Sequence, residues 1–222
     1  MQALQSTLEI LSVDIIPLVS SPPGFIAFTN SLLHHRCLPT LRSLTIRASK
    51  WNTVLTAPEF RGLFVLHALE VLHISNITSH ELDDTCIADA APSWPSLEQF
   101  HIEAPEDIGP TSIPPNVTLA GLIPLIRHCP ELNSFSIPIH AKPFDVNLLQ
   151  PGDRNMTIEY LHFEASTIEA PAAVYRRLLL MFPKLEWIVT HHLLANDDEE
   201  GWGYIREVLQ ESTDSWDSDY DH

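Results

Sequence analysis

Histidine and carboxylate side chains recur along this 222-residue chain, and such side chains bind zinc or exchange protons near neutral pH. His73 and His101 lie 28 residues apart, and Glu103 follows shortly after. If they occupy matching positions of adjacent parallel strands, about 4.8 Å apart, they can contribute to a metal site or to a pH-sensitive binding surface. The simpler interpretation is a set of exposed polar residues on a sheet. We therefore expect neither a metal nor another cofactor.

Motifs that would indicate an enzyme are missing from the sequence. It contains no GxSxG, no GxxxxGK[ST], no HExxH and no glycine triplet of the dinucleotide-binding type. Loops that bind phosphate groups are rich in glycine, and this sequence contains only 7 glycines. We therefore expect a protein that is not an enzyme.

The charge balance narrows the choice of partners. Lys and Arg total 12 against 29 Asp and Glu, which gives a formal net charge of −17. A chain this acidic repels the phosphates of nucleic acids and of anionic membranes, and we expect neither as a partner. A protein partner with a basic patch would be attracted.

The cysteines and the first residues of the chain bear on its location. Three cysteines with no CxxC pair indicate neither a disulfide framework nor a zinc knuckle, and reduced thiols predict a cytoplasmic or nuclear protein. The stretch 1–20 lacks the pattern of a signal peptide. No apolar run approaches the ~18 residues that a membrane span requires.

A repeated pattern determines the expected fold. Seven segments share the pattern apolar-x-x-apolar-x-apolar, the seventh more weakly because Thr190 takes its last apolar position. Their first positions are separated by 33, 28, 28, 35, 26 and 27 residues. The segments are Leu8/Leu11/Val13, Leu41/Leu44/Ile46, Leu69/Leu72/Ile74, Leu97/Phe100/Ile102, Leu132/Phe135/Ile137, Ile158/Leu161/Phe163 and Leu185/Ile188/Thr190. Recurrence at this spacing is typical of a leucine-rich repeat with insertions.

A proline motif and helical stretches recur in register with these strands. Four segments are preceded by x-Pro-x-Leu, at Pro39, Pro95, Pro130 and Pro183, and proline ends one element just before the next strand. Helical spacing appears over 25–32, over 119–126, where Pro124 should delay or bend the helix, and over 174–181, where Pro171 suits the first turn.

The expected architecture is an α/β irregular leucine-rich-repeat solenoid, or horseshoe. A parallel sheet would line its concave side and helices its convex side, because neither element can bury its apolar side alone. We expect about seven repeats over residues 1–195, a capping helix over 196–210 and an acidic disordered tail over 211–222. The segments 103–118 and 138–157 are expected to be irregular insertions.

Some of these segments resemble the repeats of a known protein family. The Cys-Pro-x-Leu-x-x-Phe-x-Ile run at 129–137 resembles the repeats of F-box leucine-rich-repeat proteins. The runs that begin at Trp94 and Phe182 are similar to degenerate repeats in the F-box-like families of mushroom-forming fungi. The resemblance covers residues 8–190, within which no Leu-Pro-x-Glu-type F-box is present.

The resemblance implies a protein-interaction module, the substrate-recognition repeat region of an F-box-like ubiquitin ligase adaptor. Docking to a Skp-type adaptor would need an N-terminal F-box, which no residue here supplies, since residue 8 is already within a repeat. The alternative is a free-standing leucine-rich-repeat scaffold or inhibitor unrelated to ubiquitin.

Alternation along the strands predicts which side chains form the concave binding face. The partner-binding candidates are His73, His101, His162, Tyr160, Trp187, Glu103 and Glu164. Tyr160 and Trp187 are the preferred contact residues, because exposed aromatics are enriched at binding hot spots. Glutamates also follow the first apolar position of most segments. They form either a solvated strand edge or an acidic rim that steers basic partners.

Overall fold

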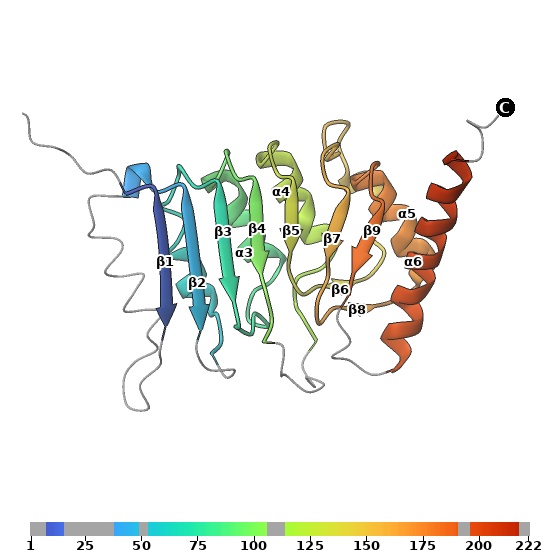
Figure 1. The fold of residues 1–222 in the computed structure, drawn as a ribbon, viewed down its shortest axis with the longest axis horizontal. Helices are drawn as coiled ribbons and strands as arrows, with labels where there is room; N and C mark the ends of the chain where they lie inside the picture. The colour runs from blue at the N-terminus through green and yellow to red at the C-terminus, as the bar shows by residue number, and fades with distance from the viewer. Residues whose placement is uncertain (1–7, 16–37, 49–52, 106–113, 191–195, 218–222) are drawn as a thin grey trace, which may run out of the picture.

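Seven strands of the described chain form one parallel sheet in which neighbours in space follow one another in sequence (Figure 1). The computed structural model describes residues 8–15, 38–48, 53–105, 114–190 and 196–217. The strands are β1 (Ile10–Ile15), β2 (Ser43–Ala48), β3 (Val71–Ser75), β4 (Gln99–Ile102), β5 (Ser134–Ser136), β7 (Tyr160–His162) and β9 (Trp187–Val189). The expected α/β fold with a parallel sheet is confirmed.

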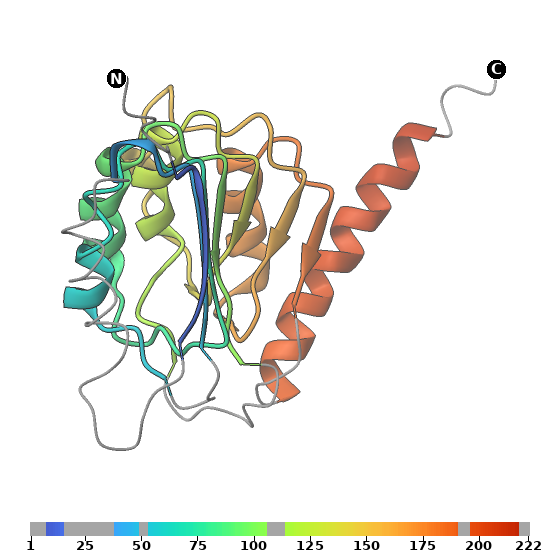
Figure 2. The ribbon, with the colours of Figure 1, turned by 60° about the vertical axis from the view of Figure 1, so that its left-hand side comes forward.

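The helices lie on one face of this sheet. They are α2 (Ala57–Arg61), α3 (Asp84–Ala90), α4 (Ile123–His128) and α5 (Pro171–Met181). Figure 2 shows them together on one side, and no described element covers the opposite side of the sheet except at its end, where α6 (Asn196–Asp217) lies beside β9. We call that opposite side the open face. A pair of two-residue strands, β6 (His140–Ala141) and β8 (Thr167–Ile168), forms a separate small sheet.

The repeated apolar residues form buried columns between the sheet and the helices. Register pairs the middle residue of each segment with that of the next, in the order Leu11, Leu44, Leu72, Phe100, Phe135, Leu161 and Ile188. All of these are buried apart from Leu11, which is partly buried and packs against the core. Burying each such side chain contributes about 1.5–3 kcal/mol. The period of two therefore sends alternate side chains to the core and to the open face, as predicted.

The x-Pro-x-Leu motifs form a recurrent tight turn ahead of the strands. The leucine N–H donates to the carbonyl of the residue before proline at Leu97, Leu132 and Leu185, each over 3.1 Å. Proline suits the second position of such a turn because its φ is already fixed near the required value. At the first of the four motifs a short 3-10 helix, η1 (Leu38–Thr40), takes this place.

The helices follow the predicted proline signals. α5 begins at Pro171, and its buried residues are Val174, Leu178 and Met181. Around Pro124 the chain forms the 3-10 helix η3 (Ala120–Leu122) before α4 begins at Ile123, which is the predicted late start. Two further 3-10 helices are η2 (Ala91–Ser93) and η4 (Val146–Leu148). The helix expected over 25–32 lies outside the described residues.

The C-terminal helix is longer than the sequence predicts. The cap expected over 196–210 continues to Asp217, so residues 211–217 are helical and the disorder expected from residue 211 does not begin there. Residues 218–222 lie outside the described residues. Buried Trp202, Ile205 and Leu209 dock the helix. Because nucleation is the costly step, a docked helix extends into polar sequence at little further cost.

Gly121 provides a stability test of the packing between η3 and α3. A Cβ on Gly121 would lie 2.1 Å from Oδ1 of Asp84, whose carboxylate accepts hydrogen bonds from the Thr118 amide (2.6 Å) and hydroxyl (2.7 Å). Because these bonds hold the carboxylate, Gly121→Ala should lower the free energy of unfolding by about 1–3 kcal/mol in urea titrations. Gly152→Ala is the control, since nothing lies within 4 Å of its added Cβ. Equal effects of the two substitutions would contradict this packing.

Candidate functional site

Register places the predicted histidines in one row across the open face. Thr45, His73 and His101 are paired on β2, β3 and β4, and the row continues through Ser136 of β5 to His162 of β7 and Val189 of β9. His73 and His101 are therefore direct neighbours, with ring centroids 5.5 Å apart. His162 is separated from them by the Ser136 position, so it does not join the pair.

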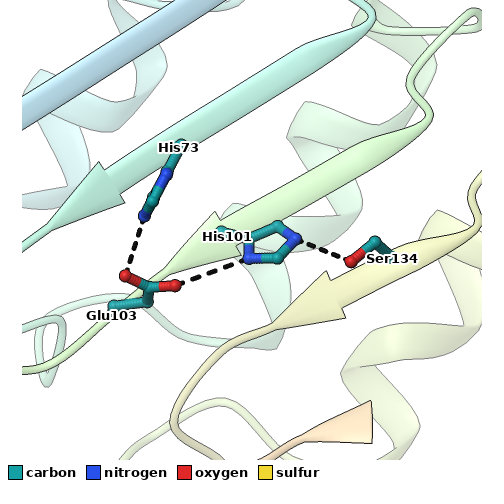
Figure 3. Close-up of polar contacts among 4 residues, drawn as sticks. All are labelled: His73, His101, Glu103 and Ser134. Atoms are coloured by element: carbon teal, nitrogen blue, oxygen red, sulfur yellow. Dashed lines mark hydrogen bonds and ion pairs between the residues drawn. The ribbon is translucent and has the colours of Figure 1, made fainter. Parts of the chain in front are cut away.

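Glu103 links the two neighbouring histidines into a polar network (Figure 3). Its Oε2 lies 2.7 Å from Nε2 of His73, and its Oε1 lies 3.5 Å from Nδ1 of His101. The other ring nitrogen of His101, Nε2, lies 2.9 Å from the hydroxyl oxygen of Ser134. With neutral rings, both imidazoles donate N–H to the carboxylate, and His101 accepts the hydroxyl hydrogen of Ser134.

The network holds Glu103 in its ionised form. Hydrogen bonds from His101 and His73 stabilise the carboxylate and lower the pKa of Glu103 from 4.5 to about 2, although partial burial opposes this shift. The ring nitrogens nearest to Glu103 point at its oxygens instead of converging on a common point. Among the residues that the structure describes, no group of three or more His, Cys, Asp or Glu side chains is arranged to hold a metal ion.

Ser134 of β5 extends the network from β4 to the next strand. A hydroxyl, an imidazole and a carboxylate contact one another here in the order used by serine hydrolases. Such enzymes also need N–H donors for the negative oxygen of the intermediate, but the amide of Ser134 donates to the Glu98 carbonyl within the sheet (3.2 Å). The amide of Ser134 is therefore not free to stabilise such an oxygen.

The lowered pKa of Glu103 predicts how the stability of the protein should depend on pH. Between pH 4.5 and 2 the folded protein keeps Glu103 charged while the unfolded chain protonates it, so its contribution to stability is complete above pH 4.5 and declines as the pH falls toward 2. Carboxyl-carbon NMR should show Glu103 titrating near pH 2. In the His73→Gln/His101→Gln variant the midpoint should move toward 4.5. A midpoint near 4.5 in the unsubstituted protein would contradict the network.

The other predicted contact residues lie toward the C-terminal end of the open face. Tyr160 and Trp187 are paired across β7 and β9, and they are 52% and 40% exposed, respectively. Glu164 lies two residues beyond β7 and is partly buried. The structure therefore forms a network of His73 on β3, His101 on β4 and Glu103 just after β4, and a separate aromatic pair on β7 and β9.

Sequence reasoning missed two polar features. One is the contact between Ser134 and His101, because the order of the strands does not reveal which side chains contact one another across them. The other is the ion pair of Arg127 with Asp153, whose carboxylate is buried and accepts from Nε at 2.9 Å. Asp153 helps to line a cavity of about 350 Å³ next to η4, with Val146, Leu149, Gln150, Pro151, Arg154 and Leu180. No spacing signal pairs Arg127 with Asp153.

Comparisons with known proteins show no family for this chain. No protein-family model matches the sequence, and no curated protein is significantly similar to it. Among solved structures, it is similar to a protein from Bacteroides fragilis at 16% identity and a TM-score of 0.42. That match covers 72% of this chain, which spans about half (46%) of the other. None of the described helices is both long and apolar enough to cross a bilayer.

Proposed function

We propose that this chain is an irregular leucine-rich-repeat solenoid that binds a protein partner on its open face. Successive strands keep the same register, buried columns continue from one strand to the next, and a tight turn precedes several strands at an x-Pro-x-Leu motif. Repeat architectures of this kind offer an extended surface built from equivalent positions. These features support the fold interpretation.

The observation that carries the functional proposal is the composition of the open face. Exposed Tyr160 and Trp187 lie on adjacent strands of the face that α2, α3, α4 and α5 leave uncovered and that α6 borders beside β9. Large aromatic side chains contribute strongly to binding when a partner buries them. The polar network of His73, His101 and Glu103 adds hydrogen-bonding groups on the same surface. A net charge of −17 favours a partner with a basic patch.

Site-specific photo-crosslinking tests this proposal. A photoreactive amino acid at Thr45 or Gln99 reports contacts on the open face, and one at Arg61 of α2 reports contacts on the helical face. In extracts of the source cells, the open-face positions should crosslink a common protein that Arg61 does not. A partner crosslinked only from Arg61, or no specific crosslink from either open-face position, would overturn the proposal.

The link to ubiquitin depends on a segment outside the repeats. If the module is the substrate-recognition region of an F-box-like protein, the full-length gene product should co-purify with a Skp-type adaptor. Residues 8–190 alone should not, since they contain no F-box motif. Partner binding without adaptor binding by the full-length product would favour the free-standing scaffold or inhibitor.

A further inference from the structure

A row of mainly acidic residues runs along one edge of the open face, at the position just before each strand. We call it the edge row, and it comprises Glu9, Arg42, Glu70, Glu98, Asn133, Glu159 and Glu186. Among these described residues, backbone hydrogen bonds of 2.7–2.9 Å join successive members, except between Asn133 and Glu159. Neighbouring side chains of the edge row are therefore close enough to share a counter-charge.

The N-terminal half of the edge row shows how such a position binds a guanidinium group. Arg42 occupies the row between Glu9 and Glu70, and its Nη1 forms an ion pair with Oε1 of Glu70. Glu9 and Glu70 lie on either side of this row position. Arg42 occupies the position and supplies a positive charge between them. Arginine suits this position because its planar guanidinium donates several hydrogen bonds to carboxylates.

The C-terminal half of the edge row has the glutamates without the arginine. Glu159 and Glu186 are direct neighbours, since the amide of Glu186 donates to the carbonyl of Glu159 (2.9 Å). Both are exposed, and no ion pair to either is found within the part of the chain that the structure describes. Like charges on adjacent strands repel each other, and a cation placed between them would relieve that repulsion.

Aromatic residues follow this unneutralised pair on the same two strands. Tyr160 and Trp187 follow Glu159 and Glu186 in sequence and are paired across β7 and β9. A guanidinium stacks on tyrosine and tryptophan faces through cation–π attraction. Next to β9 lies α6, which has eight acidic residues and one arginine (Figure 1). Its residues Glu200, Glu207 and Glu211 are exposed, so this helix adds negative charge at the β9 end of the sheet.

We infer that Glu159, Tyr160, Glu186 and Trp187 form a recognition site for an arginine in an extended segment of the protein partner. The two carboxylates bind the guanidinium as Glu70 binds Arg42, while the aromatic rings cover its faces. Lysine fits less well because its ammonium group neither stacks as a plane nor donates in a fork. This inference rests on the proposed function and names the chemistry of the partner.

Fluorescence anisotropy with dye-labelled peptides tests the site on the full chain. The probe is a Gly/Ser-rich peptide with arginine at every third position, compared with lysine and citrulline versions of the same length. The arginine peptide should bind most tightly, the lysine version more weakly, and the uncharged citrulline version at least about tenfold more weakly than the arginine peptide. Glu159→Gln/Glu186→Gln and Trp187→Ala should each weaken arginine-peptide binding by about tenfold or more.

The matched control is Glu9→Gln/Glu98→Gln, which removes the same charge from the same row but away from the aromatic pair. It should change binding by less than about twofold. Equal losses in the two double variants, or equal binding of the arginine and citrulline peptides, would overturn the inference. If that happens while Gln99 still crosslinks a partner, the protein-binding proposal stands. Without an open-face crosslink, the proposed function fails as well.

Discussion

Phe100→Ala should lower the free energy of unfolding by about 3–5 kcal/mol, the largest effect expected of any substitution considered for this chain. Phe100 is fully buried on β4, and its ring contacts those of Phe60, Trp94 and Phe135 at centroid distances of 6.4, 6.2 and 5.9 Å. Truncation removes one member of a continuous aromatic core and leaves a cavity that three rigid rings cannot fill. Urea unfolding followed by circular dichroism measures the loss.

The adjacent residue supplies a matched control for the alternation of the strand. Gln99 precedes Phe100 on β4 but is exposed on the open face. Gln99→Ala should change the free energy of unfolding by less than about 0.5 kcal/mol. If Gln99→Ala were as destabilising as Phe100→Ala, β4 would not present alternate residues to the core and to solvent. A register shifted by one residue would reverse the order of the two effects.

Trp202→Ala should lower the free energy of unfolding by about 3–4 kcal/mol and loosen the attachment of α6. The Trp202 ring packs on Phe163 with a centroid distance of 5.5 Å, and its Nε1 donates to the Ser166 carbonyl over 3.1 Å. The substitution removes the aromatic contact and leaves a buried carbonyl without its donor. In a repeat architecture the last unit depends on its cap. The amides of β9 should therefore be the first to lose their protection against hydrogen exchange.

Hydrogen exchange measured by mass spectrometry distinguishes this local effect from global unfolding. In Trp202→Ala, amides of α6 and β9 should exchange faster, whereas those of β3 and β4 should change less. Tyr204 lies on the same helix but is exposed, so Tyr204→Ala should leave both stability and exchange nearly unchanged. Uniformly faster exchange over all strands would show that α6 supports the whole sheet instead of its last strand.

Several features of the site depend on contacts between side chains of different strands, and the repeat pattern does not specify those contacts. The sequence placed His73 and His101 on adjacent strands correctly, because register follows from matching the apolar positions. It placed Glu103 near this pair but did not predict that its carboxylate contacts both rings or that Ser134 completes the network, because rotamers and the path of the chain beyond β4 decide those contacts. Arg127 and Asp153 also meet only because the 138–157 insertion folds back toward α4.

Some features of this protein follow from the sequence and others from the tertiary structure, because the interactions that determine them join residues at different separations along the chain. Apolar period and proline position act within a few residues, and so Leu44, Leu72 and Phe100 already specify one buried column and its opposite polar face. The length of α6 and the lowered pKa of Glu103 depend on contacts between residues that packing alone brings together. The sequence thus determined the sheet, its register and its two faces, and the tertiary structure decided which polar groups on those faces bind one another.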